Sequence, residues 1–136
     1  MSVPKSKRKI GELTVITKAR SLTARSLVVC SSEKHFPKRL RWCYTQNLVK
    51  EATEMFVLVN KANSVFVKSD SDAQMRIGFW RGALACAVAL QSLVDLSYDL
   101  KQVSMETTRS WVGDIVEVQS LIRSRISTET KRYANG

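Results

Sequence analysis

The side chains with the most chemistry to offer in this sequence are its cations. The chain has 136 residues and a formal net charge of +10, from 22 Lys and Arg against 12 Asp and Glu. Residues 1–41 hold 11 basic and 2 acidic side chains, a net charge of +9, and the other 95 residues hold 11 and 10, a net charge of +1. Clustered positive charge attracts polyanions, and nucleic acid is the usual one. The alternative is a solvated surface that only keeps the protein soluble.

Side chains arranged for catalysis are missing from the sequence. The single histidine, His35, falls in a predicted loop, and no phosphate-binding glycine loop or HExxH zinc motif is present. Two carboxylate pairs, Glu51 with Glu54 and Asp114 with Glu117, are each three residues apart, and we expect them on solvated helix faces. The sequence therefore predicts neither an enzyme nor a metal site, and it implies no cofactor.

The cysteines and the apolar runs bear on where the protein works. Cys30, Cys43 and Cys86 lie on or beside predicted apolar stripes, so we expect reduced core residues of an intracellular protein. The basic N-terminus is not followed by the apolar segment of a secretory signal. The longest continuous apolar run is 83–90, and a membrane span needs about 20 such residues. These features predict a soluble, cytoplasmic protein that does not enter a membrane.

The cations must be positioned by helices. Apolar residues recur at three- and four-residue steps in a stretch from Phe36 to Lys68, whose stripe is Leu40, Tyr44, Leu48, Ala52, Met55, Val59, Ala62 and Phe66. Similar spacing predicts helices over about 10–31, 72–101 and 104–131. The short links between them predict an all-α, up-down-up-down antiparallel four-helix bundle. We expect a single domain over residues 10–132, preceded by a flexible basic tail at residues 1–9.

The sequence also predicts a cap for the third helix, the burial of its apolar run, and the role of the cations that end the fourth helix. Ser71 and Gln74 read as a capping box for the third helix, and this reading of the acidic residues 69–72 is favoured over a calcium loop. The run 83–90 is apolar all round, so the third helix is either the most central one or has a second face buried against another subunit. Four basic residues near the end of the fourth helix suit its dipole and are not counted as a site. They are Arg123, Arg125, Lys131 and Arg132.

Three stretches resemble a known family. They are Phe36-Pro37-Lys38, the residues Val59-Asn60-Lys61-Ala62-Asn63 that close the second helix, and Met75 to Leu84 of the third. The family is the group of small four-helix bundles that contains proteins encoded in 23S rRNA intervening sequences and the accessory variability determinant (Avd) proteins of diversity-generating retroelements. The third stretch resembles the Avd branch more closely. The resemblance covers roughly residues 12–126.

The resemblance implies a barrel-shaped homopentamer with a basic surface. Members of the Avd branch bind the retroelement's reverse transcriptase together with its template RNA, and they support mutagenic cDNA synthesis and retrohoming without being catalytic. The positions that could contact RNA or DNA here are Lys18, Arg20, Arg25, Lys38, Arg39, Arg41, Arg76 and Arg81. Of these, Arg76 and Arg81 could instead face a subunit interface or pore. Trp42 could stack on unpaired bases, whereas Tyr44 lies on the apolar stripe and is expected in the core.

A reading from a different class stays open. The protein could be a structural homo-oligomeric bundle that acts as a protein–protein scaffold, docks on an acidic protein partner and does not bind nucleic acid. Salt-sensitive RNA binding would favour the first reading. Tight binding to an acidic protein without RNA affinity would favour the second.

Overall fold

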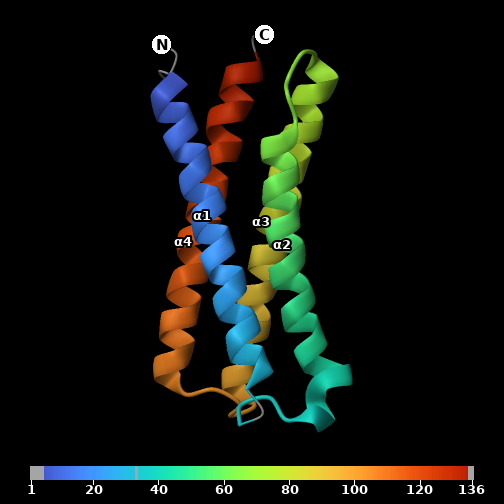
Figure 1. The fold of residues 1–136 in the computed structure, drawn as a ribbon, viewed down its shortest axis with the longest axis vertical. Coiled ribbons are helices and arrows are strands. Elements are labelled where there is room, and N and C mark those ends of the chain that lie inside the picture. Colours follow the sequence, from blue (N-terminus) through green and yellow to red (C-terminus); the bar gives the residue numbers. More distant parts are fainter. Residues whose placement is uncertain (1–4, 33, 135–136) are drawn as a thin grey trace.

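The chain folds into four long helices that alternate in direction. The computed structural model describes residues 5–32 and 34–134. The helices are α1 (Lys5–Ser31), α2 (Gln46–Ser64), α3 (Asp70–Asp99) and α4 (Met105–Ala134). Both ends of the chain lie at one end of the bundle together with the α2–α3 connection, and the other two connections lie at the opposite end (Figure 1). This arrangement confirms the predicted all-α, up-down-up-down four-helix bundle, and no strand occurs in the part of the chain that the structure describes.

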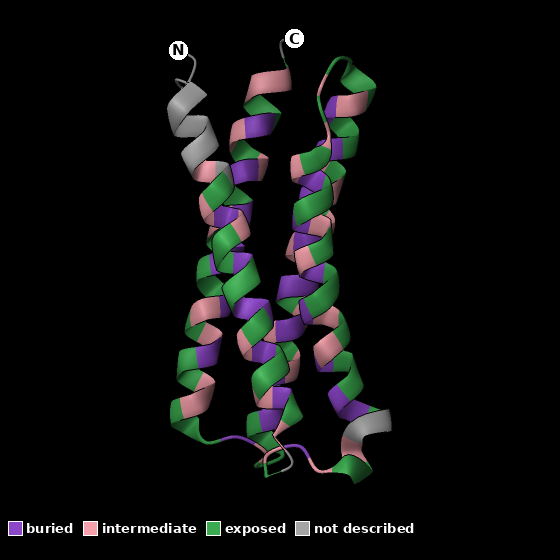
Figure 2. Cartoon of the chain, in the orientation of Figure 1, coloured by how far each residue is buried: buried purple, intermediate pink, exposed green. Residues whose placement is uncertain are grey.

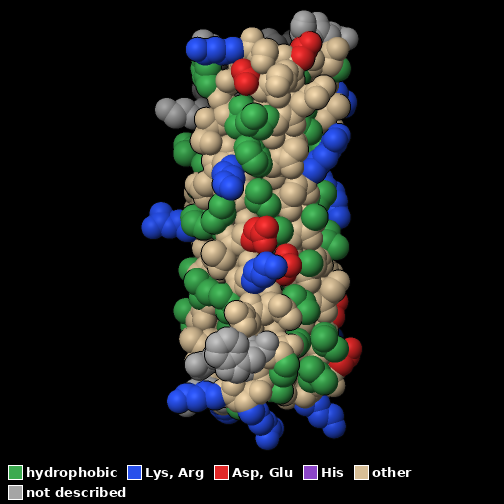
Figure 3. All heavy atoms as spheres, turned by 90° about the vertical axis from the view of Figure 1, so that its right-hand side faces the viewer, with side chains coloured by type: hydrophobic (Ala, Val, Ile, Leu, Met, Phe, Trp, Pro, Cys, Tyr) green, Lys and Arg blue, Asp and Glu red, His purple; other side chains and the backbone are tan. Residues whose placement is uncertain are grey.

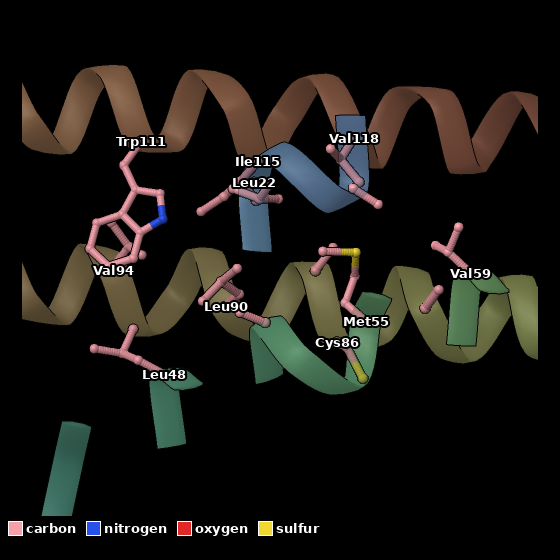
Figure 4. Packing of buried hydrophobic residues seen from close by; sticks show 14 of the residues in the cluster. Leu22, Leu48, Met55, Val59, Cys86, Leu90, Val94, Trp111, Ile115 and Val118 are labelled. Atoms are coloured by element: carbon pink, nitrogen blue, oxygen red, sulfur yellow. The ribbon is translucent and has the colours of Figure 1, made fainter. Parts of the chain in front are cut away.

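The core runs the full length of the bundle and takes side chains from all four helices. Each helix exposes one side and buries the other, as Figure 2 shows. In Figure 4, Trp111 of α4 points toward Val94 of α3, and Ile115 of α4 points toward Leu90. Side chains of α1 and α2 fill the space beside them. Burying each such large apolar side chain stabilises the fold by roughly 1.5–3 kcal/mol. Trp80, Trp111, Leu48, Met55 and Leu90 are all fully buried.

The second helical segment differs from its prediction at both ends. It begins with a 3₁₀ turn (η1, Lys38–Leu40) and a π-helical turn (η2, Arg41–Thr45), and the α-helix proper covers only Gln46–Ser64. Phe66, predicted on the buried stripe, lies beyond the helix and is 77% exposed. The helix ends there because the Arg76 guanidinium donates hydrogen bonds to the carbonyl oxygens of Ala62 and Val65, at 3.1 and 3.3 Å. The Ala62 carbonyl also accepts from the Val65 backbone N–H at 3.3 Å, so both groups complete the end of the helix.

The other helix boundaries lie close to their predicted positions. Helix α1 begins at Lys5, five residues before the predicted start. Residues 1–4 of the expected flexible tail lie outside the described part of the chain. Helix α3 is capped by Ser69 and not by Ser71, so the predicted capping box was wrong in position. The Ser69 hydroxyl accepts a hydrogen bond from the Asp72 backbone N–H at 3.2 Å, and the Asp72 carboxylate accepts one from the Lys68 N–H at 3.0 Å.

Buried polar side chains tie neighbouring helices together. Trp111 donates its indole N–H to the Ser26 hydroxyl at 2.9 Å, which joins α4 to α1. Tyr44 is buried, as predicted, and its hydroxyl donates to the Leu93 carbonyl at 2.7 Å and also contacts the Ser97 hydroxyl. These bonds satisfy polar groups that would be costly to bury alone.

Helix α3 does not occupy a more central position than the other helices. It contacts α2 and α4, just as α1 contacts α2 and α4, so each helix has two principal neighbours. Within its apolar run, Ala85 and Val88 face solvent. Whether another subunit covers them, as the second predicted alternative has it, stays a prediction.

Helix α3 is also long and apolar enough, by length and composition alone, to cross a membrane. An 18-residue window of it has a mean hydropathy of 1.5, although its longest unbroken apolar run is much shorter. A third of that window (33%) is buried inside the bundle. The core helix of a soluble bundle has the same properties, so the cytoplasmic location stays a prediction.

Candidate nucleic-acid interface

Two of the predicted binding residues on α1 are engaged in ion pairs with α4. The Lys18 ammonium lies 3.1 Å from the Glu117 carboxylate, and the Arg25 guanidinium lies 2.5 Å from the Asp114 carboxylate. Arg25 also donates to the Ser110 hydroxyl at 2.8 Å. Exposed pairs of this kind contribute up to about 1 kcal/mol each to stability. A cation that is already paired offers less net charge to a phosphate, so these two positions are weaker candidates than their sequence position suggests.

Arg76 has a structural position and not a surface one. It is 6% exposed, and its Nε lies 2.6 Å from the carboxylate of Glu129, which is 0% exposed. The same carboxylate accepts hydrogen bonds from the Arg125 guanidinium at 2.8 Å and from the Trp80 indole N–H at 3.0 Å. Arg76 is therefore a poor candidate for a contact with nucleic acid, and its place at a subunit interface or pore stays a prediction. The residue is held inside the bundle because a buried carboxylate needs positive partners.

The remaining predicted positions are spread over the molecule. Arg20 and Arg39 are exposed and make no ion pair with any described side chain. Lys38 is exposed beside Arg39, in η1, at the end of the bundle opposite the chain termini. The side chain of Arg41 lies outside the described part of the structure, as does that of Trp42. Lys38 and Arg39 therefore lie at that end of the bundle, whereas Lys18 and Arg20 lie near the middle of α1.

Arg81 lies on α3, beside an open hollow where α3 meets the end of α4. It is exposed, and the hollow has a volume of about 700 Å³. Asp70 and Gln74 line the same hollow with Ile77 and Tyr133. Because an acidic group shares the hollow, Arg81 alone does not make it an anion site.

Near its end, α4 carries three further basic residues that are not among the predicted contacts. Arg123 and Lys131 are exposed on α4, and Arg132 is half-buried with its guanidinium carbon 5.9 Å from the centre of the Tyr133 ring. The Nη2 atom of Arg132 is buried and has no hydrogen-bond partner among the described residues. The antiparallel topology itself was the signal that could have revealed this group, since it brings the end of α4 back to the start of α1 (Figure 1).

The groups that could perform catalysis have structural partners. His35 links the two connections at the end opposite the termini, with Nδ1 3.1 Å from the Gln102 carbonyl oxygen. Asp114 and Glu117 are the ion-pair partners of α1 described above, so they do not stand on purely solvated faces.

Glu54 is exposed, as predicted, and Glu51 is half-buried, but both lie beside the buried Cys86 of α3. The potential ligand atoms of these three residues lie within 4.8 Å of one another. Burial, followed by the two carboxylates, raises the pKa of the Cys86 thiol to about 12. A thiol must lose its proton to serve as a nucleophile or metal ligand. At neutral pH this thiol is protonated, so the cluster does not supply either function by itself.

The cysteines are reduced, but only two of them belong to the core. Cys30 and Cys86 are buried, whereas Cys43 is exposed in η2, so the prediction for Cys43 was wrong. The π-helical turn shifts the phase of the helix at this point, which moves residue 43 out of the stripe.

No protein-family model, curated protein or solved structure matches this chain. The evidence for the candidate interface is therefore the basic residues and their placement on the helices.

Proposed function

We propose that the protein is a basic, non-catalytic accessory protein that binds nucleic acid, template RNA or its cDNA, and a reverse transcriptase in a diversity-generating retroelement. The observation that supports it best is the net charge of +10 on a bundle whose exposed Arg20, Arg39, Arg123 and Lys131 lie outside its ion pairs. The reverse transcriptase and the retroelement come from the family resemblance.

Binding of this kind works through the phosphate backbone. Each Lys or Arg that contacts a phosphate releases a condensed counterion, and this yields affinity that is independent of sequence and falls steeply with salt. The helices keep the cations in fixed places, while contacts with the polymerase would supply specificity. The protein's own part is to hold the nucleic acid near its partner, and the chemistry belongs to the polymerase.

Purified protein should be titrated with a single-stranded RNA and a duplex DNA of equal length across a series of KCl concentrations. We expect log K to fall linearly with log salt, with a slope of about −0.7 on single strands and −0.9 on the duplex for each phosphate contacted. A folded protein that binds neither nucleic acid at low salt would overturn the proposal. Copurification of the protein with a reverse transcriptase from the same cells tests the second partner.

A homo-oligomeric scaffold without nucleic-acid binding is the second candidate. The outward side of α3 favours it, because Val88 and Leu96 are 44% and 41% exposed there. Apolar side chains at such spacing on one helix suit a subunit contact. The two functions are separated by the titration above, since a pure scaffold would show no salt-dependent RNA binding.

A further inference from the structure

The positive charge of the bundle is concentrated at one end. Each helix can be divided at its midpoint. The half that carries the chain termini, here called the terminal end, comprises residues 5–17, 56–84 and 120–134. It holds 12 Lys and Arg against 4 Asp and Glu, a net charge of +8. The described part of the opposite end, residues 19–32, 34–54 and 85–119, holds 9 against 7, a net charge of +2. Lys18, at the midpoint of α1, is paired with Glu117.

The two ends act on a ligand independently. A helix of 30 residues is about 45 Å long at 1.5 Å per residue. The Debye length at physiological salt is about 8 Å. A polyanion near one end is therefore screened from the other, so the local charge matters more than the total.

Within the terminal end, the side formed by α1 and α4 is the more positive. It holds 8 basic and 2 acidic residues, whereas the side formed by α2 and α3 holds 4 and 2. Figure 3 views the bundle from the α2–α3 side, where Asp and Glu side chains lie at the top and near the middle of the face. Both acidic residues of that side, Asp70 and Asp72, lie in the first turn of α3.

The register of the two helices places their basic segments side by side. Arg25 pairs with Asp114 and Lys18 with Glu117. At Gly11, a Cβ atom would lie 3.5 Å from the Arg125 guanidinium. Continued by two turns, this register sets the backbone of residues 5–9 beside residues 127–131 of α4. The sequence of this α1 segment carries Lys5, Lys7, Arg8 and Lys9, and the facing end of α4 carries Lys131 and Arg132.

A buried cluster lies at this end of the bundle. Two guanidinium groups, of Arg76 and Arg125, contact the carboxylate of Glu129. Arg132, whose Nη2 has no acceptor among the described residues, lies one turn away.

We infer that the α1–α4 side of the terminal end is the docking surface for the phosphate backbone of nucleic acid. This rests on the proposed function and names its site. The segment 38–41, which carries three of the predicted contacts, belongs to the opposite end, where acidic residues nearly balance the basic ones. An RNA or DNA strand lies across the first turns of α1 and the last turns of α4, held by contacts that do not depend on base sequence.

A matched pair of double variants tests the site. Lys131→Gln with Arg132→Gln removes two cations from the α1–α4 side of the terminal end, and Arg39→Gln with Arg109→Gln removes two exposed cations from the opposite end. Both variants change the net charge from +10 to +8. A third variant replaces Lys5, Lys7, Arg8 and Lys9 with Gln. Each is titrated with RNA and duplex DNA across KCl concentrations, with circular dichroism as the check on folding, and with poly-glutamate as a polyanion without phosphates.

The expected results separate the site from the function. We expect the terminal-end double variant to lose about 1.4 of the salt slope on RNA and about 1.8 on duplex DNA, if both cations contact phosphate. The opposite-end variant should bind like wild type, and the quadruple variant should lose more. Equal losses from the two double variants, or a larger loss at the opposite end, would overturn the inference and leave the proposed function standing. Absent binding by wild type overturns both. Poly-glutamate binding as tight as RNA binding would also overturn the inference.

Discussion

At Glu129, a single carboxylate accepts hydrogen bonds from two guanidinium groups and an indole. It comes from α4, while Arg76 and Trp80 come from α3. The guanidinium of Arg76 in turn holds the last carbonyls of α2. Three helices therefore depend on one side chain that is fully buried. Such clusters are costly to form but far more costly to break at one member.

Replacement of Glu129 by Gln should destabilise the protein by about 3–5 kcal/mol, because it leaves two buried guanidinium groups without a carboxylate. Urea unfolding followed by circular dichroism measures the loss. Glu117→Gln is the control, since it breaks only the exposed pair with Lys18 and should cost no more than about 1 kcal/mol. Equal effects of the two substitutions would contradict the argument.

The thiols should differ sharply in reactivity. Cys43 is exposed and should be labelled by iodoacetamide in the native protein, whereas Cys30 and Cys86 should not react at neutral pH. Burial raises the pKa of Cys30 to about 12, and burial together with the neighbouring carboxylates raises the pKa of Cys86 to about 12. Only the thiolate reacts.

The pH dependence of labelling has a definite sign. Native-state reaction of Cys30 and Cys86 should keep increasing above pH 9, toward pH 12. Because an unfolded thiol ionises near pH 9, the protonated buried thiols stabilise the fold below that pH, and this contribution is lost as pH rises toward 12. Mass spectrometry after a labelling pulse resolves each site. Native labelling of all three thiols at one rate near pH 8 would rule this account out.

At the scale of the elements, periodicity predicted what depends on local spacing. Leu48, Met55 and Val59 are buried because they lie on one face of an α-helix, and three- and four-residue spacing is sufficient to identify that face. Phe66 continues the same spacing and is nevertheless exposed, because Arg76 of the next helix ends α2 before it. That contact is tertiary, so no pattern within the segment could show it.

The same distinction between local sequence pattern and tertiary contact applies to the candidate site. The sequence showed an excess of cations in residues 1–41, and the structure divides that excess between the two ends of the bundle. The sequence could not show that Arg25 and Lys18 would find acidic partners on α4, or that the segment with Lys131 would lie beside the first turns of α1. These facts require the antiparallel register of two helices at opposite ends of the chain.

The glycines of α3 provide a test of helix packing. A Cβ atom at Gly78 would meet nothing within 4 Å, so Gly78→Ala should stabilise the protein by up to about 1 kcal/mol through helix propensity alone. At Gly82 the added carbon would lie 3.2 Å from a methyl group of Leu58, so Gly82→Ala should gain less or lose stability. Thermal unfolding of the two variants measures the difference. The opposite order would show that Gly78, and not Gly82, faces a close neighbour in the assembled protein.

At the scale of the whole molecule, two surfaces serve the two proposals. The α1–α4 side of the terminal end carries the charge, and the outward side of α3 carries exposed apolar residues. They lie on different helices, so one molecule could bind a polyanion and another subunit at the same time. A substitution on one of these surfaces should therefore leave the contacts made by the other surface intact.

The assembly variant is Val88→Glu on α3. It should lower the mass measured by light scattering if the outward side of α3 is the subunit contact, because a buried unpaired charge is costly. Val116→Glu on α4 is the matched control, since both valines are 44% exposed and Val116 lies among more polar neighbours. A wild-type protein that is monomeric at all concentrations would sink the oligomer proposal. So would dissociation by Val116→Glu alone.

The unequal ends give the bundle a large electric dipole along its long axis. In a ring of parallel copies, as the proposed pentamer would be, all the positive ends stand together and repel one another. Salt or a bound polyanion relieves that repulsion, so such a ring should assemble more readily in the presence of nucleic acid than without it. Assembly and RNA binding would then be thermodynamically coupled, so that each favours the other.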